Sequence, residues 1–248
     1  MTPVIVSASF DDMRSRHIRL LQEAAKLGQV HVHLWSDAAV EAATGQRPKF
    51  PQAEREYLVS AIRYVNRVTV TDDPPADAPA LPTPVRDADL GGLPADAGFP
   101  ADDREPPAST RKKAVVTGCY DWFHSGHVAF FEEVSGFADL IVVVGHDRTI
   151  TLLKGPGHPM FPQEERLYMV QAVRHVYRAM ISSGMGWLDA EPEILRFKPD
   201  IWVVNEDGDR PEKREFCAAH GMEYRVLKRL PKAGLPKRES TRLRGFQG

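Results

Sequence analysis

Cysteines, excess charge and long apolar runs are all scarce in this chain of 248 residues. The two cysteines, Cys119 and Cys217, are too few for a disulfide framework and have no zinc-binding spacing, which favours a reducing compartment. A formal net charge of −2 gives no electrostatic case for nucleic acid or an anionic membrane as the main partner. No apolar segment is long enough to span a bilayer, and the N-terminus lacks a signal-peptide pattern. We therefore expect a soluble, cytoplasmic protein.

One segment differs from the rest in composition. Residues 72–109 hold nine of the chain's twenty prolines and nine acidic residues, with Phe99 as the one aromatic residue. Such a sequence buries too little apolar surface to offset its ordering entropy. We predict a linker over 72–112, with an irregular loop packed over one of the halves as the alternative. On either side of the linker we predict an N-terminal half-domain over 1–71 and a C-terminal domain over 113–248.

Strand-like and helix-like patterns alternate in both halves. β-branched runs at 4–7 and 114–117 are each followed by a turn, a helical pattern and a second strand-like run. A longer helix is predicted over 161–176, because Leu167, Val170, Val173 and Val176 recur at helical spacing. Alternation of this kind indicates parallel strands joined by right-handed crossovers. The predicted fold class is α/β, with a Rossmann-like parallel sheet. Two later strands are predicted over 199–204 and 223–227, with a helix between them.

The two halves also resemble each other. A shift of 110 positions places Phe10 on Tyr120, Asp11 on Asp121, His17 on His127 and Asp37 on Asp147; a shift of 111 places Arg55 on Arg166. An ordered set of matches with one small insertion indicates an internal duplication. The first copy stops near Val70 and lacks the later strands of the second.

The most informative motif is GCYDWFHSGH at 118–127. It follows a predicted strand and opens a helix, and a helix N-terminus at the carboxyl edge of a parallel sheet attracts phosphate. His124 and His127 can donate hydrogen bonds to phosphate oxygens as charge builds in a transition state. Gly126 leaves room for a phosphate to approach the backbone. The alternative is a histidine pair that only caps the helix.

Three segments, GCYDWFHSGH, KGPGHPMFPQEERLYMVQAVRHV and KRESTRLR, occur in the order found in cytidylyltransferase-like nucleotidyltransferases. The chain is most similar to the ethanolamine-phosphate, choline-phosphate and glycerol-3-phosphate cytidylyltransferases. The ethanolamine-phosphate enzyme also carries two such domains. The resemblance covers 113–244 well and 3–71 more weakly.

The resemblance implies roles for individual residues. His124 and His127 would stabilise charge on the α-phosphate, and Lys154 would lie between the substrate phosphate and the triphosphate. Ser240 and Thr241 would bind the β- and γ-phosphates. Lys154 could instead be a solvated loop residue, Arg166 an internal ion-pair partner, and Ser240 a helix cap. The full set of expected nucleotide-binding residues is Gly118, Cys119, Tyr120, Asp121, Gly126, Asp147, Arg166, Asn205, Ser240 and Thr241; Asp207 and Asp209 are expected to be solvated.

The sequence departs from the family pattern in two places. Glu239 stands where a small hydroxyl residue is usual, and a carboxylate beside a triphosphate is unfavourable unless it points away or faces a magnesium ion. In the first copy, Arg14 and Arg16 replace the first histidine and the glycine. We predict that this half is catalytically silent and forms an intrachain pseudo-dimer with the second. A regulatory anion site at Arg14 and Arg16 is the alternative, and a homodimer is possible.

The expected function is transfer of CMP from CTP to a small phosphorylated alcohol or sugar, with release of pyrophosphate. Mg²⁺ would be held mainly by the nucleotide, because the sequence offers no dedicated carboxylate cage or other metal site. Two alternatives are an adenylyltransferase of the same superfamily and a catalytically impaired nucleotide sensor. The acceptor stays open, since Tyr120, Trp122 and Trp187 could contact it or belong to the core.

Overall fold

A computed structural model describes residues 3–73, 99 and 106–243 of the chain. The chain divides into two compact units, one of residues 1–100 with the short segment 172–174, the other of 101–171 and 175–248. Most of the predicted linker, 74–98 and 100–105, lies outside the described residues. Among the helices that are described, none is long and apolar enough to cross a membrane.

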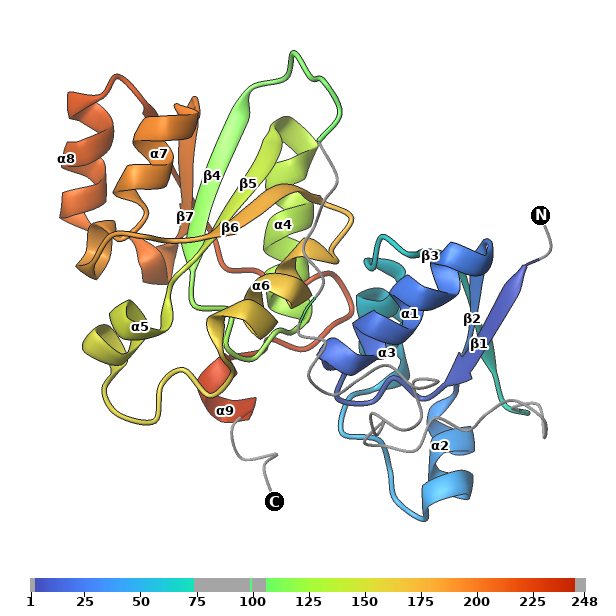
Figure 1. Ribbon diagram of the computed structural model, residues 1–248. Helices are drawn as coiled ribbons and strands as arrows, with labels where there is room; N and C mark the ends of the chain where they lie inside the picture. The colour runs from blue at the N-terminus through green and yellow to red at the C-terminus, as the bar shows by residue number, and fades with distance from the viewer. Residues whose placement is uncertain (1–2, 74–98, 100–105, 244–248) are drawn as a thin grey trace. The chain divides into compact units, whose positions relative to one another are not determined.

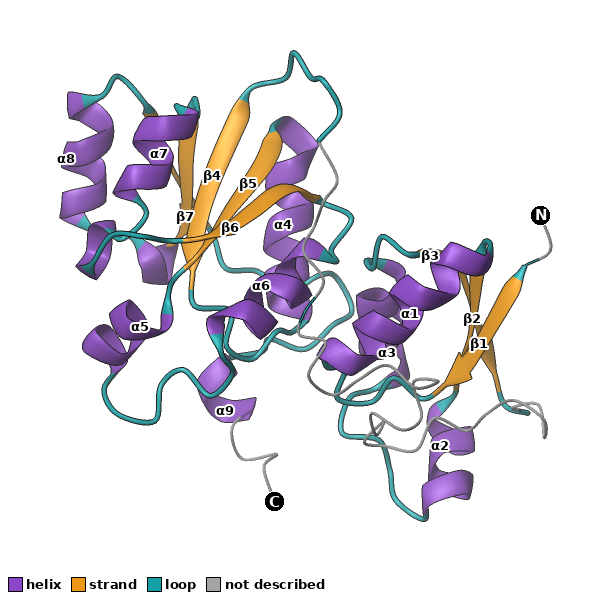
Figure 2. Cartoon of the chain, viewed as in Figure 1, coloured by secondary structure: helices purple, strands orange, loops and turns teal. Residues whose placement is uncertain are grey.

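The N-terminal unit contains a three-stranded parallel sheet in the order β1-β2-β3 (Figure 1). Helices and strands alternate along the chain as predicted (Figure 2). The elements are β1 Val4–Ala8, α1 Ser15–Leu27, β2 Val30–Trp35, α2 Asp37–Thr44, α3 Gln52–Ser60 and β3 Val65–Thr71.

The C-terminal unit contains a five-stranded parallel sheet in the order β6-β5-β4-β7-β8. The elements are β4 Lys113–Gly118, α4 Ser125–Phe137, β5 Asp139–Val144, α5 Asp147–Lys154, α6 Gln163–Gln171, β6 Val176–Ile181, η2 Gly186–Leu188, α7 Glu191–Phe197, β7 Ile201–Asn205, η3 Glu206–Gly208, α8 Pro211–Ala219, β8 Glu223–Leu227 and α9 Ser240–Leu243. The α/β class with parallel sheets is therefore confirmed.

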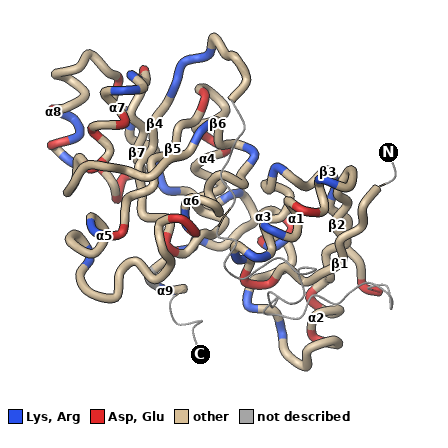
Figure 3. The backbone as a smooth tube through the Cα atoms, in the orientation of Figure 1, with Lys and Arg blue, Asp and Glu red and all other residues tan. Residues whose placement is uncertain are grey.

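The sheet of the C-terminal unit is covered on both faces. Alternate residues of its central strands, such as Val115 and Trp202, pack against Ile194 of α7 and Phe216 of α8. The helices α4 and α6 cover the opposite face (Figure 1). Strand β5, which lies between β6 and β4, is buried along its whole length, as expected for a parallel strand enclosed by helices. Acidic and basic residues are interspersed along both units (Figure 3).

The helix predicted over 161–176 is shorter than expected, and that prediction is wrong at its C-terminal end. Helix α6 ends at Gln171, and Val176 begins β6, which pairs with β5 in parallel. The β-branched residues near this end fit a helical spacing and also a strand. Pairing along β5 selects the strand, which local periodicity cannot reveal.

The two units share a buried arginine with the same bonding pattern. Arg166 donates to the carbonyls of Phe161, Cys119 and Gly145 and to Asp147. Arg55 donates to the carbonyls of Phe50, Ser9 and Trp35 and to Asp37. Each guanidinium thus joins the ends of two neighbouring strands to the turn before the next helix.

Two further features recur at equivalent positions. Asp121 accepts hydrogen bonds from the backbone N–H groups of Met160 and Phe161, while Asp11 accepts from Lys49 and Phe50. The strand register shifts between Val30 and His31 in one sheet and between Leu140 and Ile141 in the other. These hydrogen bonds and register shifts therefore recur in the two units with the same residue separation as the sequence matches.

Replacing Arg166 by methionine should lower the free energy of unfolding of the C-terminal unit by about 3–5 kcal/mol, because three carbonyls lose a buried guanidinium donor and Asp147 loses its ion-pair partner. Urea unfolding of the full chain measures this change. The exposed Arg148 provides the control, and Arg148→Met should stay within about 0.5 kcal/mol of the wild type. Equal stability of Arg166→Met and the wild type would show that the guanidinium bonds contribute little.

Candidate active site

A cavity of about 330 Å³ lies at the carboxyl edge of the C-terminal sheet, where β4 ends and α4 begins. Open α/β sheets bind their ligands at this edge. The lining residues are Thr117, Gly118, Cys119, Tyr120, Asp121, His124, Gly126, His127, Phe130, Lys154, His158, Val204, Asn205, Asp207, Arg229, Glu239 and Ser240.

The ring of Tyr120 supports the turn that follows β4. Tyr120 has a positive φ of 55°, and its buried ring packs edge-on against His127 and Phe131. A Cβ atom on Gly118 would lie only 2.7 Å from Cζ of the Tyr120 ring. Glycine at 118 therefore lets the tyrosine fold back and support the histidine turn.

His124 is the N-cap residue of α4. Its Nδ1 accepts a hydrogen bond of 3.1 Å from the backbone N–H of Gly126. Because Nδ1 is an acceptor, the ring proton of the neutral imidazole resides on Nε2. Nε2 is buried and has no hydrogen-bond partner among the described residues. Burial, and then the charges of Arg229 and Arg238, lower the pKa of His124 to about 3, so the ring is a neutral donor.

His127 has the same protonation pattern. Its Nδ1 accepts from the backbone N–H of His124 at 3.3 Å, which again leaves the proton on Nε2. The two imidazoles stack with their centroids 4.0 Å apart. Burial and the adjacent His124 hold the pKa of His127 well below its usual value. The site therefore presents two neutral N–H donors.

Gly126 has a steric role within the protein that the sequence did not reveal. A Cβ atom at this position would lie 2.9 Å from Cε1 of His124 and 3.0 Å from its Nδ1. These distances are shorter than van der Waals contact. The glycine therefore makes room for the His124 ring, whereas the sequence suggested room for a phosphate.

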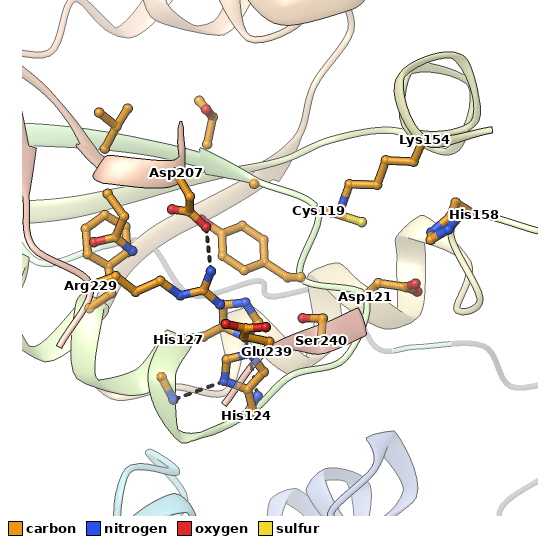
Figure 4. Close-up of a pocket in the computed structure, with 17 residues that line it drawn as sticks. Cys119, Asp121, His124, His127, Lys154, His158, Asp207, Arg229, Glu239 and Ser240 are labelled. Atoms are coloured by element: carbon orange, nitrogen blue, oxygen red, sulfur yellow. Dashed lines mark hydrogen bonds and ion pairs between the residues drawn. The ribbon is translucent and has the colours of Figure 1, made fainter. Parts of the chain in front are cut away.

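Cationic side chains enter the cavity from two sides (Figure 4). Lys154, the last residue of α5, lies on one side, and Arg229, just after β8, lies on the other. Arg229 forms a 2.5 Å ion pair with Asp207 and donates to the carbonyl of Arg238. Sequence reasoning missed Arg229. Asp207 is exposed, as expected for a solvated side chain, and it is also paired with Arg229. The available signal for Arg229 was its position close after a predicted strand, at the sheet edge where ligands bind.

The predicted site residues fall into two groups. Most of them line the cavity, and Ser240 also donates to the carbonyl of Trp122 at 3.4 Å. Asp147 and Arg166 pair with each other at 2.7 Å and are not among the lining residues, so the ion-pair alternative describes their contacts. The N-cap position of α9 is held by Glu239, whose carbonyl accepts from the backbone N–H groups of Arg242 and Leu243, and Ser240 is the first residue of the helix. The side chain of Thr241 lies outside the described residues.

The equivalent turn of the N-terminal unit lacks one of the two donors. His17 is buried and accepts from the backbone N–H of Arg14 through Nδ1, as His127 does from His124. Arg14 occupies the N-cap of α1 and forms an ion pair with Asp12 at 2.9 Å. An arginine side chain cannot accept the hydrogen bond that His124 accepts.

Comparison with known proteins connects this site to a family. The model of the family described as "Cytidylyltransferase-like" matches residues 115–223. The FAD synthase of Methanopyrus kandleri is 37% identical over 106 residues, which cover 41% of this chain and 67% of that protein. The chain belongs to the cytidylyltransferase-like family. Its C-terminal unit is accordingly a nucleotidyltransferase.

Two further matches cover about half of this cytidylyltransferase-like chain. The bifunctional protein HldE of Azotobacter vinelandii is 31% identical over 125 residues, covering 48% of this chain and 25% of that protein. The chain thus spans only a quarter of that relative. The lipopolysaccharide core biosynthesis protein of Thermoplasma volcanium GSS1 has 23% identity and a TM-score of 0.40, over 52% of this chain and 98% of that chain. At that TM-score the structural match adds nothing to the assignment.

Replacing Gly126 by alanine should lower nucleotidyl transfer by roughly 100-fold, because the new Cβ displaces His124 and misdirects its Nε2 donor. Release of pyrophosphate measures the rate. Gly136, near the other end of α4, has no atoms within 4 Å of its would-be Cβ. Gly136→Ala should therefore keep full activity and gain up to about 1 kcal/mol of stability. Full activity in Gly126→Ala would contradict this role of the glycine.

Proposed function

We propose that the C-terminal unit transfers the adenylyl group of ATP to the phosphate of a small substrate and releases pyrophosphate. The observation that carries the proposal is the buried Nε2–H of His124, which lines the cavity without a partner among the described residues. A buried donor of this kind favours an anionic ligand. The name of the FAD synthase relative favours the adenylyl group, because FAD contains AMP joined to a phosphate.

The reaction would proceed by direct displacement. A phosphate oxygen of the acceptor attacks the α-phosphorus, the new P–O bond forms, and the bond to the pyrophosphate oxygen breaks. The Nε2–H groups of His124 and His127 would donate to the α-phosphate oxygens, where negative charge builds. Lys154 would neutralise charge between the acceptor phosphate and the triphosphate. Positioning and charge stabilisation carry such phosphoryl chemistry without a covalent enzyme intermediate.

A divalent cation such as Mg²⁺ would accompany the triphosphate. Within the described part of the chain, no group of three or more His, Cys, Asp or Glu residues could hold a metal ion. The cavity nevertheless presents the carboxylates of Asp207 and Glu239, and Mg²⁺ prefers oxygen ligands. These residues fit a cation that the nucleotide carries into the site. When bound, the cation would neutralise charge on the phosphates.

Cytidylyl transfer is the second candidate. The description of the matching family names this activity, and the ordered motifs of the sequence resemble the CTP-using members. The two candidates share the phosphate chemistry and differ in the base that the site accepts. The identity of the acceptor, whether an alcohol phosphate, a sugar phosphate or a larger phosphate ester, is open in both.

We further infer that the N-terminal unit is a truncated and silent second copy of the catalytic one. The matched bonds of Arg55 and Arg166, and the matched register shifts of the two sheets, support a duplication. Arg14 offers no acceptor for the turn, and Arg16 stands where Gly126 makes room for a ring. The sequence left two roles open for this unit, a structural one and a regulatory anion site at Arg14 and Arg16. We favour the structural role.

The proposed function is tested by pyrophosphate release with ATP and CTP across a panel of small phosphate esters. We expect turnover with ATP, and a loss of roughly 100-fold or more in kcat for His124→Ala and for His127→Ala, because each removes a preorganised donor. His17→Ala in the N-terminal unit should leave kcat unchanged, provided that the variant is folded.

Turnover with CTP in place of ATP would select the second candidate. Near-normal turnover in both histidine variants would contradict the mechanism. Nucleotide binding without turnover across the whole panel would favour a sensor over an enzyme with this reaction.

A further inference from the structure

The cavity has more carboxyl side chains than lysine and arginine side chains on its walls. Lys154 and Arg229 are its two basic side chains besides the histidines, while Asp121, Asp207 and Glu239 are acidic. The lowered pKa values of His124 and His127 keep these rings neutral. A triphosphate carries several negative charges, and a carboxylate that the protein does not compensate would repel it. A cation that enters with the triphosphate would offset this repulsion.

Two of the three carboxylates are committed to the protein. Asp121 is buried and accepts the backbone N–H groups of Met160 and Phe161 at 2.7 and 3.0 Å. Asp207 is bonded to the guanidinium of Arg229. These contacts fix the shape of the cavity wall and compensate both charges.

The ion pair of Glu239 is longer than that of Asp207 and has a more exposed partner, although the Asp207 carboxylate is itself 58% exposed. Its carboxylate pairs with Arg242 at 3.3 Å, but the Arg242 side chain is 84% exposed and that of Glu239 is 40% exposed. An ion pair in this environment is screened by water and contributes little. Glu239 is thus the carboxylate that a cation in the cavity could recruit at the lowest cost.

The position of Glu239 relates it to the histidine turn. The carbonyl oxygen of the preceding residue, Arg238, lies 3.9 Å from the would-be Cβ of Gly126. Figure 4 shows Glu239 in the same part of the cavity wall as His124 and His127. Nε2 of His124, which has no partner among the described residues, is an independent sign that an anion binds here. An anion at that donor would be repelled by Glu239 unless a cation lay between them.

We propose that Glu239 is the protein's contact for the divalent cation that accompanies the triphosphate. The inference rests on the proposed function, because it takes the cavity to be the nucleotide site. Mg²⁺ commonly binds through one or two carboxylates together with substrate phosphates and retained water molecules. Glu239 then repels the metal-free nucleotide and attracts the metal-bound one. It makes nucleotide binding depend on the cation.

The test is calorimetric titration of the full chain with α,β-methylene ATP and, separately, with α,β-methylene CTP. Each titration is carried out once in MgCl₂ and once in EDTA. We expect the wild type to bind the analogue at least about tenfold more tightly with Mg²⁺. Glu239→Gln should lose most of this ratio, chiefly because it binds the metal-free nucleotide more tightly. The control is Glu215→Gln, which removes the same charge from an exposed position on α8 and should keep the wild-type ratio.

An unchanged Mg²⁺ ratio in Glu239→Gln would overturn the inference while leaving the nucleotide site intact. Failure of the wild type to bind either nucleotide with Mg²⁺ would contradict the proposed function and the inference together. Titration with Mn²⁺ followed by electron paramagnetic resonance gives a second readout. With the nucleotide analogue present, Glu239→Gln should bind Mn²⁺ at least about tenfold more weakly than the wild type. Equal Mn²⁺ affinity in the two proteins would also overturn the inference.

Discussion

The hydrogen bond from the backbone N–H of Gly126 to Nδ1 of His124 determines what this site can do. It fixes the neutral tautomer, with the proton on Nε2, in a ring that is almost completely buried. The neighbouring His127 is fixed in the same way by the backbone N–H of His124. Two neutral donors can stabilise charge that develops on a phosphate without having to gain or lose a proton. The chemistry thus rests on preorganised hydrogen bonds.

The surrounding structure holds this turn in place from several directions. Asp121 ties it to the backbone before α6, and Arg166 joins the ends of β4 and β5. The ring of Tyr120 packs against His127, which requires glycine at 118. The N-terminal unit contains the arginine and aspartate of this scaffold but only one of the two histidines. Its geometry supports the idea that the scaffold and the chemistry can be separated.

The sequence was sufficient for much of the fold and for the centre of the site. Alternating patterns predicted the parallel α/β architecture, and the spacing of His124, Gly126 and His127 singled out a turn that lines the cavity of the C-terminal unit. Val176 was misassigned, because β-branched residues fit both periods and only pairing with β5 decides between them. The 22-residue separation of Asp207 and Arg229 leaves no local pattern, so their ion pair emerged only from the folded chain. The close approach of Gly126 to the His124 ring could not be predicted, because it depends on the position of that ring in the folded chain.

The protonation state of the two histidines is the central claim, and ¹⁵N nuclear magnetic resonance of the imidazoles tests it most directly. Spectra of the free full chain, assigned with His124→Gln and His127→Gln, should show the neutral Nε2–H tautomer for both rings. Because the pKa of His124 is about 3 and that of His127 is also well below 6.5, neither signal should change between pH 8 and pH 5. A protonation midpoint near pH 6.5, or a proton on Nδ1 of either ring, would contradict the account.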